Sequence, residues 1–286
     1  MFVIIGLVVV LGSMITGFTM AGGNVAVLIQ ISEFITIGGI AFGTLLIANP
    51  PSFIGKLIQA ILGLLKGNPY TKQSYTDLLK MLYDLFMVAR REGMVALEQH
   101  AEHPENSEIF KRFPMFLANH HAVAFLTDTL KVVIAGSVQP TDLAEMMDVD
   151  LEQSHAEAMK VPTVLQNTGD AMPGYGIVAC VLGVVVTMGS IGGKPEVIGH
   201  HVACALVGTF LGILLAYGVF APLSQAVGGV VAAESQYMNC IRSALVAFSR
   251  GDAPMTAVEF ARRNVMPEYR CSFAEMEAAL KAGAQA

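Results

Sequence analysis

The chain contains an uncharged stretch, VACALVGTFLGILLAYGVF, at Val202–Phe220. No polar residue recurs along it at the 3.6-residue spacing that would give a soluble helix a polar face. In a lipid bilayer every backbone amide needs a partner inside its own segment, so an apolar run of this kind must be helical. The stretch therefore predicts a transmembrane helix over about 202–222.

The composition of the whole chain supports a membrane protein. Of its 286 residues, 54% are hydrophobic and 14% are charged, against about 25% charged in average globular domains, and the mean hydropathy is +0.58. Residues 1–55 contain Glu33 as their one charged residue, and residues 161–241 contain one base, Lys194, and three acids. The net charge of −6, with no basic stripe, excludes a nucleic-acid-binding protein.

Three further spans complete two membrane hairpins. Residues 2–20 are 19 uncharged residues, which as a helix reach about 28 Å of the roughly 30 Å hydrocarbon core. A second span covers 32–48 and ends at Asn49-Pro50-Pro51, because proline does not continue a helix. A third begins at Met172-Pro173 and covers about 172–191. The sequence thus predicts an all-α integral membrane protein with four segments: a transmembrane hairpin (1–50), a helical cytoplasmic domain (51–168), a second transmembrane hairpin (169–226) and a helical cytoplasmic tail (227–286).

The basic residues predict the orientation of these segments. Sixteen of the 17 lie in 51–165 or after residue 225, and Lys194 alone lies between spans three and four. By the positive-inside rule both large segments are cytoplasmic, and both termini with them. The apolar N-terminal run has no basic region before it and is too long for a cleavable signal peptide, so we expect none.

The connection 51–165 is expected to be helical. Thr71 or Ser74 can cap a helix whose apolar residues recur every three or four positions. Further helices are expected after Asn106, over 116–135 and from Pro140 to about Val161-Pro162, and one in the tail over 272–282. The connection has 14 acids and 10 bases, so we expect it to contact a protein rather than anionic lipid.

The sequence contains no constellation typical of an enzyme. The pairs His120-His121 and His200-His201 are adjacent, whereas metal-binding histidines on a helix lie three or four residues apart. No HExxH, nucleophile-elbow or Walker A motif is present, and the four cysteines form no CxxC pair. We therefore expect neither enzymatic activity nor a metal or other cofactor.

Small residues recur within the predicted spans. Spans three and four present Gly176, Cys180, Gly183 and Thr187, and Ala205, Gly208, Thr209, Gly212 and Ala216; span two adds Gly39 and Gly43. Small residues let helix backbones approach closely, so these positions indicate either packing within the bundle or a smooth wall against another helix. Glu33 and Asp170 lie at span ends, and Thr209 is the best deep polar group. If ions cross here, the carboxylate must come from another chain.

These residues also resemble a known family. LVGTFLGILLAYG at 206–218, followed by Pro222, resembles the fourth span of the flagellar stator proteins of the MotA family. Similar blocks occur in order along essentially the whole chain: Gly169-Asp170 with Pro173, GIVA at 176–179, GVV at 183–185, YTK at 70–72, Arg90 through Gly93-Met94 to Leu97-Glu98, and AVEF at 257–260.

The resemblance implies a function and partners. By this resemblance we expect five such chains to surround two copies of MotB, each of which supplies a proton-accepting aspartate, in the bacterial cytoplasmic membrane. Ion flow turns the ring, and its cytoplasmic domain turns the rotor protein FliG. The resemblance assigns these residues: Thr209, Cys180, Ala216 and Tyr217 to the ion pathway, Pro173 and Pro222 to conformational coupling, and Arg90 and Glu98 to the rotor interface. Sodium-type relatives carry a threonine near Cys180, whose sulfur suits a hard cation poorly, so we predict proton use.

Several alternatives stay open on the residues alone. Arg90 and Glu98 would lie about 80° apart on one helix and could form an ordinary solvated face. Pro173 and Pro222 could simply mark helix boundaries. For the whole chain, the alternatives are a proton-driven energiser like TolQ or ExbB, which generally have three spans, and a passive membrane scaffold.

Overall fold

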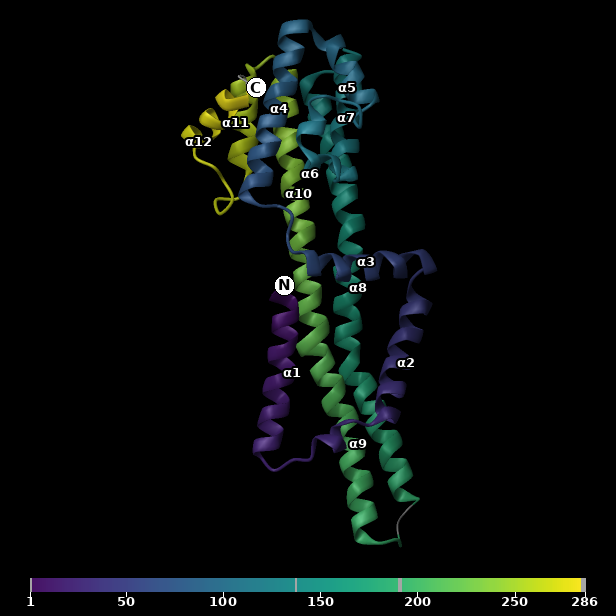
Figure 1. The fold of residues 1–286 in the computed structure, drawn as a ribbon. Coiled ribbons are helices and arrows are strands. Elements are labelled where there is room, and N and C mark those ends of the chain that lie inside the picture. Colours follow the sequence, from purple (N-terminus) through teal and green to yellow (C-terminus); the bar gives the residue numbers. More distant parts are fainter. Residues whose placement is uncertain (1, 137, 190–191, 284–286) are drawn as a thin grey trace. The chain divides into compact units, whose positions relative to one another are not determined.

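A computed structural model describes residues 2–136, 138–189 and 192–283 of the chain, and all regular secondary structure in these ranges is helical (Figure 1). Four helical segments in them are long and apolar enough to cross a membrane, the number that the sequence predicts. The chain divides into two compact units, one formed by residues 1–67 and 159–229 and the other by 68–158 and 230–286.

The first unit begins with a helical hairpin. Helix α1 (Phe2–Met20) leads through a short 3₁₀ helix, η1 (Val25–Leu28), into α2 (Ile31–Ala48). Asn24 caps η1, because its side chain accepts a hydrogen bond from the backbone of Ala26. After Asn49-Pro50 the chain forms α3 (Pro51–Lys66), which lies crosswise to α1 and α2 (Figure 1).

The second pair of membrane helices is longer than the sequence suggested. Helix α8 (Pro140–Met188) is 49 residues long, and α9 (Pro195–Leu215) continues through a π-helix, η4 (Ala216–Phe220), into α10 (Ala221–Ser249). The expected helix end at Val161-Pro162 is therefore wrong, and so is the interpretation of Pro173 and Pro222 as helix boundaries. The third predicted span reached 191, and its residues 190 and 191 lie outside the described ranges.

Packing explains why helix α8 continues through its prolines. Proline removes one backbone donor and leaves the carbonyl four residues earlier without its helical partner, but packing against neighbouring helices can outweigh this cost. The Ser224 hydroxyl of α10 donates to the backbone oxygen of Pro162 at 2.8 Å. Around Pro173, buried Met172 and Ala179 form a core with Ile37 of α2 and Leu211 of α9. Sequence alone gives the local cost of a proline but not these contacts.

The second unit is a separate helical bundle with its own core. It contains α4 (Lys72–Glu92), η2 (Met94–Leu97), α5 (Glu98–Glu102), η3 (Phe110–Arg112), α6 (Pro114–Leu117), α7 (His120–Ile134), α11 (Pro254–Asn264), α12 (Phe273–Gly283) and the adjoining parts of α8 and α10. Its core includes Leu82 and Phe86 of α4, both fully buried. The Phe86 ring stacks on Phe248 of α10 with centroids 4.2 Å apart.

Local capping fixes the helix starts in this unit. Thr71 and Ser74 together form a capping box, so both candidate caps of α4 take part. Asn119 caps α7 by accepting from the backbone of Ala122, which is why this helix begins at His120 rather than at the expected residue 116. The helix expected after Asn106 is only the three-residue η3.

Candidate functional site

Helices α8 and α9 approach each other through the glycines singled out in the sequence. A Cβ placed on Gly176 would lie 2.6 Å from the backbone oxygen of Gly208 and 3.2 Å from Cα of Gly212. One placed on Gly212 would lie 2.6 Å from the backbone oxygen of Met172. Further along, a Cβ on Gly183 would lie 2.7 Å from Cβ of Ala205. Backbone therefore faces backbone along this interface, and any larger residue would force the two helices apart.

Thr209 and Cys180 lie beside this interface. Both are half-buried in the isolated chain. A Cβ on Gly176 would lie 3.2 Å from Cα of Thr209, and one on Gly208 would lie 3.2 Å from the backbone nitrogen of Cys180. The two residues therefore come from facing helices at one level of the bundle.

Ala216 and Tyr217 lie in the π-helix η4. Ala216 is buried and Tyr217 is 69% exposed, so the two residues differ sharply in accessibility. The π-helix ends just before α10, whose second residue, Pro222, cannot donate to the preceding turn. Such wider turns often occur at functional sites. Gly169 of α8 makes room for η4, because a Cβ there would lie 2.8 Å from Cβ of Phe220.

Glu33 enters the same bundle, which its position at a span end did not suggest. Its side chain is 7% exposed. A Cβ on Gly208 would collide with Oε2 of Glu33, and this oxygen is buried without a hydrogen-bond partner among the described residues. The α2–α9 contact brings the first turn of α2 against the middle of α9. A carboxyl group of this chain therefore reaches one of the small-residue faces, although Glu33 lies at the start of its span. Asp170, in contrast, is exposed and accepts a hydrogen bond from Gln166 at 2.8 Å.

Arg90 and Glu98 are exposed on the second unit but do not share a helix. Arg90 lies in the last turn of α4, which ends at Glu92, and Glu98 begins α5. Between them Gly93 has φ +92°, a conformation that favours glycine and redirects the chain. The expected 80° separation on one helix is therefore wrong. A cavity of about 450 Å³ adjoins Arg90 and is lined mainly by apolar residues, among them Met94, Val133, Leu143 and Phe248.

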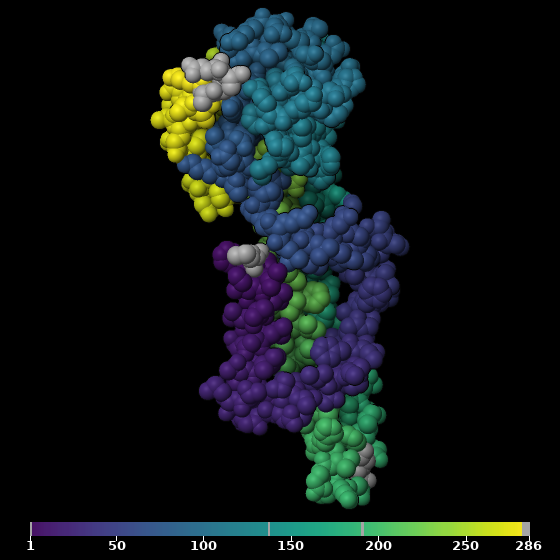
Figure 2. Space-filling view, in the orientation of Figure 1, coloured from purple at the N-terminus to yellow at the C-terminus, as the bar shows by residue number. Residues whose placement is uncertain are grey.

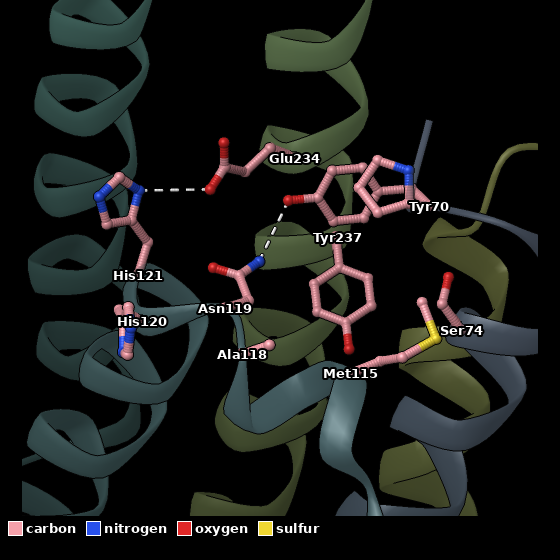
Figure 3. Close-up of a pocket in the computed structure, with 10 residues that line it drawn as sticks. Tyr70, Ser74, Met115, Ala118, Asn119, His120, His121, Glu234 and Tyr237 are labelled. Carbon is pink, nitrogen blue, oxygen red and sulfur yellow. Dashed lines mark hydrogen bonds and ion pairs between the residues drawn. The ribbon is translucent and has the colours of Figure 1, made fainter. Parts of the chain in front are cut away.

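A second cavity in this unit is lined by the adjacent histidines His120 and His121. It measures about 450 Å³ and lies between Tyr70, His120, His121 and Tyr237 (Figure 3). Nδ1 of His121 lies 3.3 Å from Oε1 of Glu234, and Nδ2 of Asn119 donates to the Tyr70 hydroxyl at 3.1 Å (Figure 3). Burial, helped by the Glu234 carboxylate, raises the pKa of Tyr70. Within the described ranges no three His, Cys, Asp or Glu side chains form a candidate metal site.

The fold and the glycine-lined interface define a class of all-helical membrane proteins with four candidate spans. Two family models match this chain: the motility protein A N-terminal family over residues 4–93, and the MotA/TolQ/ExbB proton channel family over residues 118–240. Motility protein A of Salmonella typhimurium is 36% identical to the chain over 282 residues, which cover 99% of the chain and 96% of that protein. Motility protein A of Escherichia coli is 37% identical over the same shares.

Solved structures agree with this fold. The structure of C. jejuni MotAB matches with a TM-score of 0.77 at 19% identity and covers 94% of this chain and 98% of that one. The flagellar MotAB stator complex from Bacillus subtilis matches with a TM-score of 0.74 at 19% identity and covers 96% and 98%. The chain belongs to the motility protein A family within the MotA/TolQ/ExbB proton channel family. It is a flagellar stator subunit of the bacterial inner membrane, in a family of ion channels rather than of known enzymes.

Proposed function

We propose that five copies of this chain surround two copies of a MotB partner and conduct protons through the assembly. The observation that carries this proposal is the backbone-to-backbone interface of α8 and α9, with Thr209 and Cys180 beside it. Such a wall supplies smooth surface, and the acid of this chain that reaches it, Glu33, belongs to the first turn of α2 rather than to α8 or α9. We therefore assign the group that binds the proton to a helix inserted from a partner. The matched MotAB structures support a MotB partner.

We propose that the unit formed by 68–158 and 230–286 is cytoplasmic, with both termini on the same side. The distribution of basic residues supports this topology, because Lys194 is the one base in the loop between α8 and α9. In this arrangement Arg90 and Glu98 face the cytoplasm and contact the rotor protein FliG. The exposure of both side chains supports that role.

The ion pathway follows the inner edge of the α8–α9 pair. Thr209 offers a hydroxyl oxygen, while Cys180 offers a sulfur that binds sodium poorly, so protons are the transported ion. Ala216 and Tyr217 extend the pathway toward the π-helix. Pro173 and Pro222 couple ion binding to movement, because each leaves a helix with a missing backbone hydrogen bond where it can bend.

Two alternative functions have less support. An energiser like TolQ or ExbB would move an envelope partner, but such proteins generally have three spans, whereas this chain has four candidate spans. A passive scaffold would need no partner carboxylate. The alignment with motility protein A, at 36–37% identity, covers 99% of the chain and favours the stator.

Co-purification tests the proposal directly. The tagged chain is co-expressed with a MotB-type protein from the same bacterium, one that has a single N-terminal transmembrane helix, an aspartate in that helix and a peptidoglycan-binding domain. We expect a stable complex with a five-to-two ratio by native mass spectrometry. Recovery of rings without that protein, under conditions that keep a reference MotAB complex intact, would contradict the proposal.

A further inference from the structure

The cavity beside His120 and His121 has two chemically different walls. The ten described residues that line its volume of about 450 Å³ all belong to the second unit. Tyr70 and Tyr237 form one side, and His121 and Glu234 lie on the other (Figure 3). Small-molecule sites in proteins usually have volumes of about 300–1,000 Å³, so a small ligand fits here.

The cavity lies where separate segments of this unit meet. Tyr70 lies just before α4, Asn119 lies between α6 and α7, and Glu234 belongs to α10. Helices α4 and α6 contact each other, and the space-filling view shows the segment around α4, in blue, beside that of α5–α7, in teal (Figure 2). A ligand in the cavity therefore contacts three parts of the chain that are far apart in the sequence.

The aromatic wall is held in place by neighbouring rings. The ring centroids of Tyr70 and Tyr237 are 5.3 Å apart, and those of Tyr75 and Tyr237 are 5.6 Å apart. Nδ2 of Asn119 donates to the Tyr70 hydroxyl at 3.1 Å, and burial raises the pKa of this hydroxyl, so it stays neutral. This wall thus offers aromatic surface without charge.

Glu234 provides the negative charge of the opposite wall. Its side chain is 28% exposed, and its Oε1 lies 3.3 Å from Nδ1 of His121. The carboxylate also contributes to the raised pKa of Tyr70, so its electrostatic effect extends across the cavity. The His121 side chain is 80% exposed and can turn into solvent, which leaves the carboxylate to a ligand.

These two walls select the charge and the hydration of a ligand. An anion would meet Glu234 and, among the described lining residues, no lysine or arginine. A metal ion needs several ligand atoms close together, and no three His, Cys, Asp or Glu side chains in the described ranges form such a group. A weakly hydrated organic cation, in contrast, is attracted both to the carboxylate and to the faces of aromatic rings.

We propose that this cavity binds a small organic ammonium ion. Its cationic group lies between the Glu234 carboxylate and the rings of Tyr70 and Tyr237, and its apolar part contacts Pro69 and Met115. Two independent features carry the inference, the volume of the cavity and the pairing of one acid with an uncharged aromatic wall. The inference depends neither on the ion that the stator conducts nor on its rotor contact.

Choline and dimethylbutanol provide the test, because they differ only in the quaternary nitrogen, which is carbon in the neutral alcohol. The full chain is purified in complex with its MotB-type partner, and binding of each compound is measured by saturation-transfer difference NMR of the methyl protons. We expect choline to bind about tenfold more tightly than dimethylbutanol. Bound choline should also raise the melting temperature of the complex.

Three variants locate the binding site. Glu234→Gln should weaken choline binding about tenfold and leave dimethylbutanol binding unchanged. Glu108→Gln, which removes an 87% exposed carboxylate of the same unit, is the matched control and should change neither. Because Glu234→Gln also removes the ion pair with His121, we include His121→Ala, which removes the pair but keeps the carboxylate. This variant should bind choline at least as tightly as the wild type.

Four outcomes would overturn the proposal. Equal affinity for choline and dimethylbutanol would show that the cavity is merely apolar. Choline binding that Glu234→Gln leaves unchanged would place the cation elsewhere. Weakening by His121→Ala as large as that by Glu234→Gln would show that the ion pair only maintains the structure. Absence of choline binding to the intact complex would show that assembly closes the cavity.

Discussion

Gly212→Ala is the sharpest test of the α8–α9 interface. The added Cβ would lie 2.6 Å from the Met172 oxygen and 3.0 Å from Cα of Gly176. Carbon–oxygen contacts are ordinarily about 3.3–3.6 Å, so the helices must separate by roughly 0.7–1.0 Å. Both obstacles are backbone atoms that no rotamer change can move. Overpacking of this kind costs about 1–3 kcal/mol.

The matched control is Gly43→Ala in α2, where an added Cβ meets nothing within 4 Å. Both variants gain the same higher helix propensity of alanine, about 1 kcal/mol. The difference in thermal stability between them therefore reports the effect of the α8–α9 interface alone. The assay is thermal stability of the detergent-solubilised assembly, followed by size-exclusion chromatography. We expect Gly212→Ala to lose assembly at a lower temperature than Gly43→Ala. Equal stability and equal motility of the two variants would refute the close-packing argument.

Four other predictions follow from the remaining sites. Pro222→Ala restores a backbone donor after the π-helix, so we expect slower swimming at unchanged expression; wild-type swimming would argue against coupling there. Arg90→Glu and Glu98→Lys should each reduce motility while assembly and proton flow persist; motility that survives both charge reversals would show that these residues do not contact the rotor. Replacing external sodium by potassium at constant proton-motive force should leave swimming unchanged, and arrest would indicate sodium use. Burial lowers the pKa of His100 from 6.5, so the stability that it contributes is present above this pH and is lost as the pH falls through its folded-state pKa; His100→Gln should flatten acid unfolding, measured by circular dichroism.

Sequence patterns predicted the membrane helices well, because bilayer insertion depends on local composition. The uncharged runs at 2–20 and 202–220 needed no tertiary information to be assigned as helices. The extent of the long helices could not be predicted in the same way. Pro162 and Pro173 lie inside α8, where contacts from other helices outweigh the cost of a missing backbone donor.

The candidate site shows the same division between local and long-range information. The glycine spacing in 176–183 and 208–212 indicated close approach without revealing which atoms meet. Glu33 looked peripheral from its place at the start of a span, yet α2 lies so that its carboxyl group contacts Gly208. The sequence does contain a signal for this burial, because Glu33 is the one acid in an otherwise uncharged run of 55 residues, and an acid in such a run often has a functional role.

Proton flux in reconstituted vesicles tests the central claim, that this chain forms a channel wall and a partner supplies the proton-binding acid. The comparison includes the chain alone, its complex with the single-span partner, and that complex with Glu33→Gln, which removes the buried acid of this chain. We expect no flux from the chain alone and equal flux from the two complexes. Flux from the chain alone at the rate of the complex, or its loss in Glu33→Gln with assembly intact, would contradict the account.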